Sequence, residues 1–325
     1  MEQRVITFSR NVFLPLTTVC RNRCSYCCFR TPVQDGCILP PGDVERTLRL
    51  GAETGCTEAL FTFGERPEME RGFTGRIRAL GYQDILEYCY RMCERALAHG
   101  LLPHTNAGVL TSGEMDRLRE VNASMGLMLE TTARVPAHRQ SPGKVPAVRI
   151  EMIENAGRLR IPFTTGILVG IGETETDREE SLSVIRDLHR RYGHIQEVIV
   201  QNFCPKVNTP MAGEGSPTTE EMCRAIALAR EILPRDVAVQ IAPNLIDAAQ
   251  LLKCGVNDLG GVSPCTIDYV NPEHPWPQIE DLRALVGDAH LRERLCIYPR
   301  YIEKGYFHPR IEVLIRDLAK QIQER

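Results

Sequence analysis

Three cysteines stand close together in a pattern that suits a metal cluster. Cys20, Cys24 and Cys27 are separated by three and then two residues, and they follow an apolar run at 11–19. An electron-transfer [4Fe–4S] cluster normally takes four cysteines, so a set of three leaves one iron without a protein ligand. Catalytic metal sites keep an open position of this kind. The spacing therefore predicts a cluster that takes part in chemistry.

Other uses of these cysteines fit less well. A structural zinc site needs a fourth ligand, and Cys28 is the nearest candidate, but neighbours on an extended chain point to opposite sides. A disulfide framework is disfavoured because the 13 cysteines are an odd number and we expect no secretory segment. A zinc-stabilised binding module is the non-enzymatic alternative.

The composition indicates an intracellular enzyme. The formal net charge is −3 and 43% of the residues are hydrophobic, which favours a large core and gives no sign of a nucleic-acid partner. No apolar run has membrane-spanning length. We therefore expect a cytoplasmic protein in a reducing compartment, with neither a nucleic-acid nor a membrane partner.

Strand-like and helix-like segments alternate along the chain, which predicts parallel strands with right-handed crossovers. We therefore expect an α/β fold, a (βα)8 TIM-type barrel over residues 1–261. Residues 262–325 are expected to form a C-terminal extension that packs on the barrel and is not an independent domain. A six-stranded partial barrel is the alternative, because the last two strand patterns are weak. Strands are expected at 11–19, 57–63, 101–104, 124–130, 163–169, 197–203, 236–241 and 256–261, and helices at 41–54, 82–99, 113–121, 145–158, 175–191, 218–232 and 245–253.

Polar residues and glycines follow most of the expected strands. Active sites of such barrels form at the carboxyl ends of the strands. A lone glycine or asparagine there is more often a turn residue, but many on one rim favour a site. The residues in question are Gly64, Glu65, His104, Thr105, Asn106, Glu130, Gly170, Glu173, Asn202, Lys206 and Asn244.

Three features together resemble the radical S-adenosylmethionine (radical SAM) superfamily. The cysteine loop has an aromatic residue, Tyr26, before its last cysteine, and Gly64-Glu65 stands where that superfamily has a Gly-Glu turn. The segment Gly166–Glu173 resembles its adenine-contacting strand, with Leu168 in place of isoleucine. The resemblance implies a [4Fe–4S] cluster on Cys20, Cys24 and Cys27, with S-adenosylmethionine on the fourth iron.

The same resemblance assigns contacts to S-adenosylmethionine. Glu65 would hold the methionine amino group, Glu130 the ribose hydroxyls and Arg149 the methionine carboxylate. The alternatives are a helix cap for Glu173, a buried ion pair with an arginine for Glu130 and a surface ion pair for Arg149. The full set of implied cofactor-binding residues is Tyr26, Gly64, Glu65, Glu130, Arg149, Gly166, Gly170 and Glu173.

Within the superfamily, residues 5 to about 280 resemble the CofG group of FO synthases, through phrases such as FTFGERPE, PHTNAG and VNPEHPWP. FO is 7,8-didemethyl-8-hydroxy-5-deazariboflavin, the precursor of coenzyme F-420. The group implies an ammonia-releasing lyase that closes the deazaflavin ring of 5-amino-5-(4-hydroxybenzyl)-6-(D-ribitylimino)-5,6-dihydrouracil. A CofH-type enzyme that adds tyrosine, or a menaquinone-pathway relative, is the alternative within the superfamily.

The resemblance also implies partners and substrate contacts. A CofH-type enzyme would supply the substrate, and ferredoxin or flavodoxin would supply electrons. Arg21, Arg23 and Arg30 could dock that donor; the alternatives are an ordinary solvated face or a charge that tunes the cluster. His104 is the candidate acid or base, with a hydrogen-bonding bystander as the alternative. The candidate substrate-binding residues are Thr105, Asn106, Asn202, Asn244 and Asp268.

The other cysteines are expected to be structural. Cys89 and Cys93 are four residues apart on a predicted helix, where buried small residues are the expected role. Cys204, Cys254 and Cys265 are expected near the rim, but their spacing matches no ferredoxin pattern. We therefore expect one cluster only.

Overall fold

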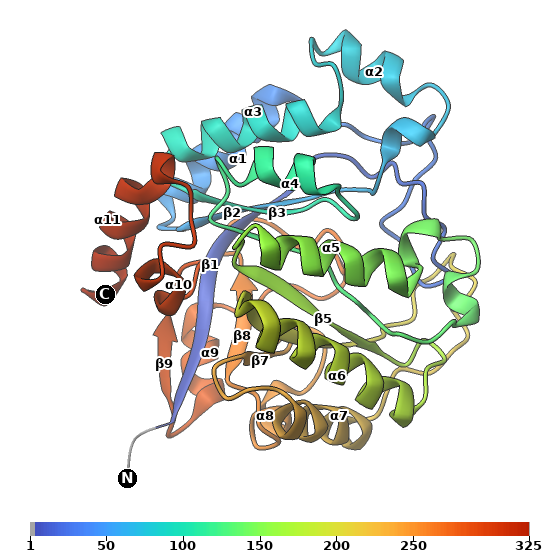
Figure 1. Ribbon diagram of the computed structural model, residues 1–325, viewed down its shortest axis with the longest axis vertical. Helices are drawn as coiled ribbons and strands as arrows, with labels where there is room; N and C mark the ends of the chain where they lie inside the picture. Colours follow the sequence, from blue (N-terminus) through green and yellow to red (C-terminus); the bar gives the residue numbers. More distant parts are fainter. Residues whose placement is uncertain (1–3, 325) are drawn as a thin grey trace.

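Eight parallel strands close into a barrel in the computed structural model, which describes residues 4–324 (Figure 1). The strands follow chain order around the sheet, and β1 pairs with both β8 and β2, which closes the ring. The predicted eight-stranded barrel is confirmed, and the six-stranded alternative is wrong. The strands are β1 (Val5–Pro15), β2 (Glu58–Thr62), β3 (Leu102–Asn106), β4 (Ser124–Gly126), β5 (Phe163–Val169), β6 (Ile195–Asn202), β7 (Ala238–Gln240) and β8 (Asp258–Val262).

Helices cover the outside of the barrel between successive strands. Three of them begin at capping boxes, in which Thr111, Thr174 and Thr218 each accept a hydrogen bond from the third helical amide. Such caps fix where a helix starts and so how it packs on the sheet. The helices of the barrel are α1 (Pro41–Glu53), α2 (Phe73–Ala79), α3 (Ile85–Ala98), α4 (Ser112–Leu118), α5 (Pro146–Arg158), α6 (Glu175–Tyr192), α7 (Thr219–Ile232) and α8 (Ala248–Leu252).

Apolar side chains fill the layer between the strands and the helices. Leu48 of α1 and Tyr88 and Met92 of α3 are completely buried there. Burying one large apolar side chain contributes about 1.5–3 kcal/mol. Cys89 and Cys93 of α3 belong to the same layer and are also fully buried, as expected for small core residues.

The first strand begins earlier than predicted. It runs from Val5 to Pro15, and its first half pairs with β8 and with a ninth strand, while Asn11–Pro15 pairs with β2. After Pro15 the chain leaves the sheet and makes only single bridges, between Thr17 and Ile38 and between Val19 and Thr31. The apolar residues up to Val19 are buried in this loop instead of continuing the strand.

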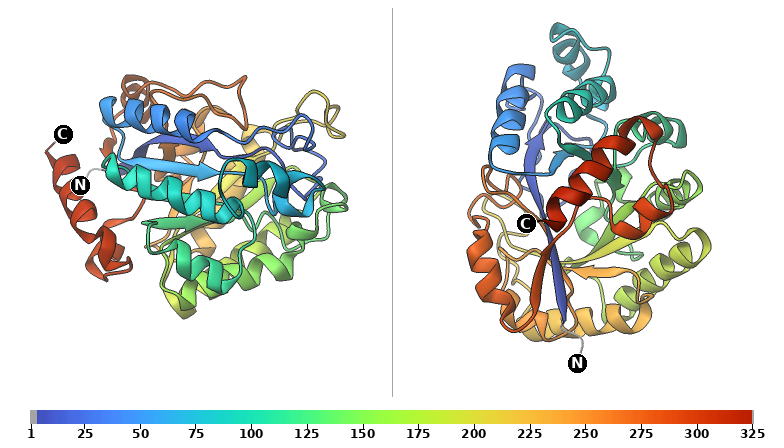
Figure 2. Two further views of the ribbon diagram at one scale, coloured as in Figure 1. Left: turned by 90° about the horizontal axis from the view of Figure 1, so that it is seen from above. Right: turned by 90° about the vertical axis from the view of Figure 1, so that its left-hand side faces the viewer.

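The chain after β8 packs on the barrel and also extends its sheet. It contains α9 (Ile279–Val286), β9 (His290–Glu293), α10 (Pro299–Glu303) and α11 (Glu312–Gln323). Strand β9 pairs in parallel with the start of β1. Figures 1 and 2 show α10 and α11 at the end of the barrel away from the loops of residues 16–40. There Tyr301 and Ile315 bury against Leu102 and Ala123.

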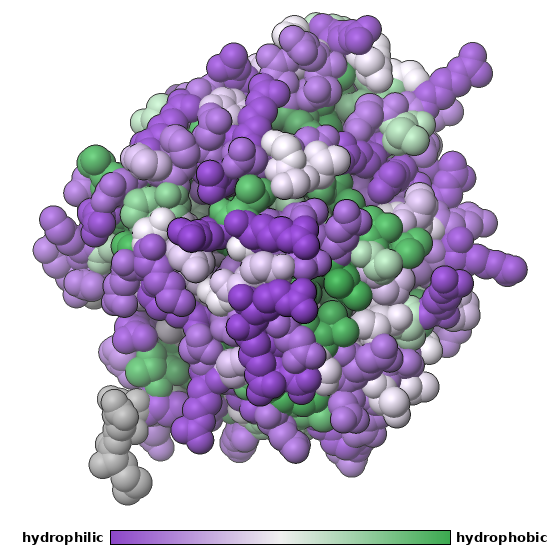
Figure 3. Space-filling view, in the orientation of Figure 1, coloured by the Kyte–Doolittle hydropathy of each residue, from purple (hydrophilic) through white to green (hydrophobic). Residues whose placement is uncertain are grey.

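The surface drawn in Figure 3 is mostly hydrophilic, with small scattered apolar areas. Among the described residues, no helix is both long enough and apolar enough to cross a membrane.

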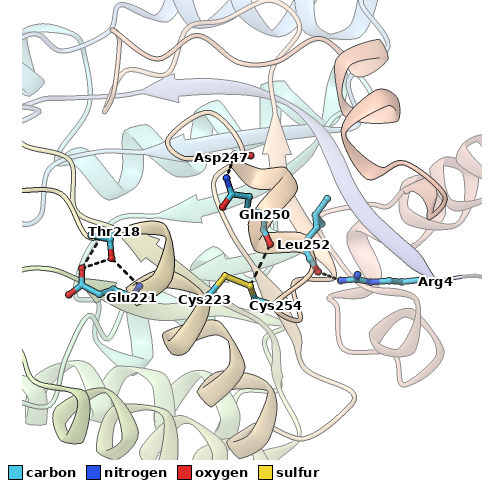
Figure 4. The surroundings of a disulfide bond; sticks show 8 residues. All are labelled: Arg4, Thr218, Glu221, Cys223, Asp247, Gln250, Leu252 and Cys254. Atoms are coloured by element: carbon cyan, nitrogen blue, oxygen red, sulfur yellow. Dashed lines mark hydrogen bonds between the residues drawn. A yellow bond between two sulfur atoms is a disulfide. The ribbon is translucent and has the colours of Figure 1, made fainter.

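Two of the three cysteines expected near the rim lie elsewhere. Cys254 follows α8 and forms a disulfide with Cys223 of α7 (Figure 4), so the expectation against disulfides is wrong for this pair. Because Cys254 precedes β8, it lies at the amino end of that strand. Cys265 folds back beside Cys56, just ahead of β2. Cys204 is the one that lines the cavity at the rim.

Candidate active site

The cysteine loop follows β1 and folds over the carboxyl ends of the strands. The thiol sulfur of Cys20 accepts a hydrogen bond from the Glu65 amide (3.2 Å), and that of Cys24 accepts one from the Ser141 hydroxyl (3.3 Å). The Cys27 amide donates to the Cys24 carbonyl (3.1 Å), which turns the chain between them. Burial raises the pKa of all three thiols, that of Cys20 to about 11.

The thiols fit the ligand set of an iron–sulfur cluster. Cluster iron binds thiolates, and hydrogen bonds to the sulfurs tune such clusters, as the bonds to Cys20 and Cys24 would. Within residues 4–324, no three His, Cys, Asp or Glu side chains converge as they would around a single metal ion. The Cys28 thiol donates to the Val270 carbonyl (3.4 Å) in the segment after β8, so this side chain is directed to the extension.

The Gly64-Glu65 turn lies against this loop. A side chain at Gly64 would overlap the Val19 carbonyl, so only glycine allows the close approach. The Gly64 amide donates to the Thr17 carbonyl (2.9 Å), and the Arg21 amide donates to the Glu65 carbonyl (2.9 Å). The backbone of the turn is thereby tied to the cysteine loop on both sides.

The Glu65 carboxylate is buried among positively charged groups and hydrogen-bond donors. It accepts hydrogen bonds from Arg21 Nε (2.8 Å) and from the Val109 amide (3.0 Å), and it lies 3.9 Å from Arg149 Nη2. Burial opposes ionisation, but Arg149, the Val109 amide and Arg21 lower the pKa of Glu65 below its usual value. The group is therefore a carboxylate at neutral pH.

Arg149 is buried, so the alternative in which its side chain forms a surface ion pair is wrong. Its side chain is 4% exposed. It donates to the carbonyl of Gly143 (2.9 Å) and to the carbonyl of Met128. These bonds connect α5 to the loop after β4 and place a guanidinium group beside Glu65.

Glu130 lies just past the end of β4 with a positive φ of 67°. Its buried carboxylate accepts hydrogen bonds from Tyr26 and Lys144 and lies 2.9 Å from His138 Nε2. Burial opposes ionisation, but Lys144, His138 and Arg149 hold the pKa of Glu130 well below its usual value. The sequence reasoning missed Lys144 and His138 and allowed for an arginine as the partner.

Glu173 fastens the turn after β5. Its carboxylate accepts hydrogen bonds from the amides of Gly170 (2.9 Å) and Ile171 (2.8 Å) and from Arg178 Nε (2.8 Å). The cap of α6 is Thr174, so the alternative of Glu173 as the cap is wrong. Gly170 has a φ of +98°, and a side chain at Gly166 would overlap the Ile199 carbonyl. Both glycines are therefore required by the backbone.

The barrel interior opens at this rim into a cavity of about 370 Å³, here called the chamber. Tyr26, Cys27 and Glu130 line it near the cysteine loop. Residues 268–276 of the extension border its mouth, where Lys206 pairs with Glu273. A second and larger groove, of about 1480 Å³, lies at the other end of the barrel between β1, β9 and the helices of the extension.

The predicted substrate-binding residues divide into two groups. Asn106, Asn202 and Asp268 line the chamber. Thr105 does not, because side chains alternate along β3, and its hydroxyl donates to Asn122 Oδ1 (2.7 Å) on the outer face of the sheet. Asn244 donates to Asp268 Oδ2 (3.0 Å) and so holds the extension instead of facing the cavity. The structure thus places Thr105 and Asn244 outside the lining of the chamber.

His104 faces the chamber but is unsuited to proton transfer near neutral pH. Burial, together with the charge of Arg294, lowers its pKa to about 3, so the ring is neutral. Its Nδ1 lies 2.7 Å from the hydroxyl of Ser124. These observations favour the hydrogen-bonding role over the acid–base role.

The floor of the chamber is a charged layer that the sequence reasoning missed. Arg294, which follows β9, enters the barrel and donates to Glu197 Oε2 (2.6 Å) and to Asp258 Oδ2 (2.6 Å). Tyr298 donates to the same two carboxylates (2.8 and 2.9 Å), and its ring lies 4.4 Å from the guanidinium carbon. The extension thus supplies the positive charge inside the barrel.

The fold and the cysteine loop agree with comparisons to known proteins. Residues 14–185 match the radical SAM superfamily, so the chain belongs to this superfamily. Methylornithine synthase PylB has a similar fold, with a TM-score of 0.64 at 17% identity over 87% of this chain and 86% of that one. The hydrogenase maturase HydG from Carboxydothermus hydrogenoformans gives 0.68 at 18% identity, over 98% and 82%.

Relatives of higher sequence identity define the family within the superfamily. A protein of Methanoculleus marisnigri is 71% identical over 99% of this chain and 97% of its own length. A protein of Archaeoglobus fulgidus is 51% identical over 96% of each. Both are named 7,8-didemethyl-8-hydroxy-5-deazariboflavin synthase, and the chain is a member of that family.

Proposed function

We propose that this protein is a radical SAM lyase that forms FO from 5-amino-5-(4-hydroxybenzyl)-6-(D-ribitylimino)-5,6-dihydrouracil and releases ammonia. The observation that carries the proposal is the 71% identity to a named synthase over 99% of the chain, which includes the chamber as well as the cysteine loop. Methionine and 5′-deoxyadenosine are the expected by-products.

The cluster and S-adenosylmethionine together supply a 5′-deoxyadenosyl radical when both are bound. Cys20, Cys24 and Cys27 are the proposed iron ligands. Glu65 and Arg149 lie side by side with opposite charges, which suits the amino and carboxylate groups of a methionine. A carboxylate such as Glu130 can accept from both hydroxyls of a ribose, with Tyr26 and Lys144 holding it in place.

The chamber has the shape and lining for the second substrate. It lies within the barrel, and it presents amide groups from Asn106 and Asn202 for a polar substrate. A CofH-type enzyme is the proposed source of this substrate, and a low-potential ferredoxin or flavodoxin is the proposed electron donor. Arg21 and Arg30 pair with Glu65 and Glu70, which leaves Arg23 as the exposed member of the three proposed docking residues.

An anaerobic assay tests the proposal. Reconstituted protein is mixed with dithionite, S-adenosylmethionine and the dihydrouracil substrate, and FO is followed by its fluorescence. We expect FO and 5′-deoxyadenosine from the wild type and neither from Cys24→Ala. The matched control is Cys28→Ala, which removes a thiol next to the motif and keeps all three proposed ligands.

The outcomes separate the parts of the proposal. Formation of 5′-deoxyadenosine without FO would contradict the substrate and leave the radical chemistry standing. Full FO formation by Cys24→Ala would contradict the ligand assignment.

A further inference from the structure

Two hydrogen-bond acceptors on the walls of the chamber have no partner within residues 4–324. They are the side-chain carbonyl oxygens Asn11 Oδ1 on β1 and Gln240 Oε1 on β7. Both residues line the chamber, and Asn11 is only 1% exposed. A buried polar atom without a partner costs free energy, so such a pair of atoms points to a ligand that donates hydrogen bonds.

The backbone of β8 makes room for these two amides. A side chain at Gly261 would overlap the Asn11 amide nitrogen, and one at Gly260 would overlap that of Gln240. Gly260 also has a φ of +69°, a conformation that favours glycine. Two adjacent glycines thus leave the amides free to lie over the chamber floor.

A carboxyl group completes this part of the cavity. Asn11 and Glu58 are direct neighbours in the register of β1 and β2, and both line the chamber. Glu58 Oε2 accepts a hydrogen bond from the Ser9 hydroxyl (2.8 Å). Burial raises the pKa of Glu58 to about 7, so near neutral pH this group can both donate and accept.

The position of these groups decides which part of a substrate they meet. Asn11 and Glu58 lie at the level where β2 begins, inside the barrel, whereas Tyr26 and Cys27 belong to the loop beyond the carboxyl end of β1, and all four residues line the chamber. The reacting atoms of the substrate must lie near the end where the radical forms. The portion of the substrate that does not react is then left to contact the floor of the chamber.

We propose that the floor of the chamber binds the ribityl chain of the substrate, with Asn11, Gln240 and Glu58 accepting hydrogen bonds from its hydroxyl groups. The inference rests on the proposed function, because that function defines a substrate with a polyol arm. A ribityl chain carries a hydroxyl donor on every carbon except the one bound to nitrogen. The pyrimidine ring also has N–H donors, but they alternate with carbonyl oxygens, so the ring matches a cluster of unpaired acceptors less well than a row of hydroxyl groups.

Equilibrium binding of the product tests this assignment without turnover. The ligands are FO and the same deazaflavin with a methyl group in place of the ribityl chain, titrated by fluorescence. We expect the wild type to bind FO about 100-fold more tightly than the methyl compound, as several hydrogen bonds would give. Gln240→Leu should weaken FO binding by about 3- to 10-fold and leave the methyl compound unchanged.

The control variant is Gln250→Leu, which makes the same change on the exposed face of α8 and should alter neither constant. Equal binding of the two ligands by the wild type would overturn the inference. This comparison uses the wild type alone, so it does not depend on whether a variant folds. Equal weakening of both ligands by Gln240→Leu would also overturn it. If the wild type cleaves S-adenosylmethionine and makes no FO, the proposed function fails instead.

Discussion

Replacing Arg294 by methionine should remove a large share of the free energy of unfolding. The guanidinium group is 5% exposed and makes hydrogen bonds of 2.6–2.8 Å to Glu197 and Asp258. Removing one partner of a buried ion pair leaves uncompensated charge and destabilises by about 3–5 kcal/mol. Total stabilities of about 5–15 kcal/mol are usual, so we expect a large shift of the denaturation midpoint.

The free energy of unfolding lost in Arg294→Met should depend on pH in a defined direction. Burial raises the pKa of Glu197 even with Arg294 present, and without the arginine this pKa must rise further. A carboxyl group whose folded pKa lies above its unfolded value binds protons more readily in the folded state. The destabilisation is therefore small at low pH and grows as pH rises through the folded pKa, by up to about 1.4 kcal/mol per pH unit for each group.

Urea denaturation of the cluster-free protein, followed by far-ultraviolet circular dichroism at pH 5.5 and 8, measures this effect. The matched control is Arg316→Met on α11, where the arginine forms an exposed pair with Glu312 four residues earlier. That change should lower the free energy of unfolding by about 0.5 kcal/mol or less. A loss below about 1 kcal/mol for Arg294→Met, or the same loss at both pH values, would refute the reasoning.

Three further predictions concern single positions. Gly143→Ala should raise the S-adenosylmethionine concentration needed for half-maximal 5′-deoxyadenosine formation by about tenfold, because the new methyl group would displace the Glu65 carboxylate. His104→Gln should leave the shape of the pH–rate profile of FO formation unchanged, because a pKa of about 3 keeps the histidine neutral throughout that range. Thiol titration of unfolded, cluster-free protein that was never reduced should count eleven free thiols, because Cys223 and Cys254 are bonded to each other.

Each of these has a control or a contrary result. Gly113→Ala places a methyl group in open space and should leave the half-maximal concentration unchanged. A pH–rate profile that loses an ionisation in His104→Gln would show that the histidine titrates during turnover. A count of thirteen thiols would show that the disulfide does not form.

Local patterns account for the parts of the fold that the sequence predicted well. The apolar run at 163–169 is β5, and the threonine with early acids at 218–221 is the capping box of α7. Both signals involve only neighbours in the chain. The alternation of side chains along β3 was equally readable, and applied strictly it would have removed Thr105 from the list of substrate contacts.

The rest of the site depends on residues that no local pattern brings together. Arg294 reaches the chamber floor from the extension, and Lys144 reaches Glu130 from a loop of short 3-10 turns. The disulfide joins Cys223 of α7 to Cys254 in the turn after α8, 31 residues further along the chain. Only the tertiary fold sets these neighbours, so spacing and composition could not show them.

The pairing of β1 with β9 has a consequence for how the protein is made. The strand β1 leaves the ribosome with the edge beside Val5–Phe8 open, and the partner for that edge, His290–Glu293, is synthesised only after all eight barrel strands. Arg294 follows at once, so Glu197 and Asp258 are synthesised well before the arginine that pairs with them. Pairings this distant form slowly, and the unfinished barrel exposes strand edges. The cysteine loop therefore emerges before β2 to β8, and the charged floor of the chamber is completed only after them.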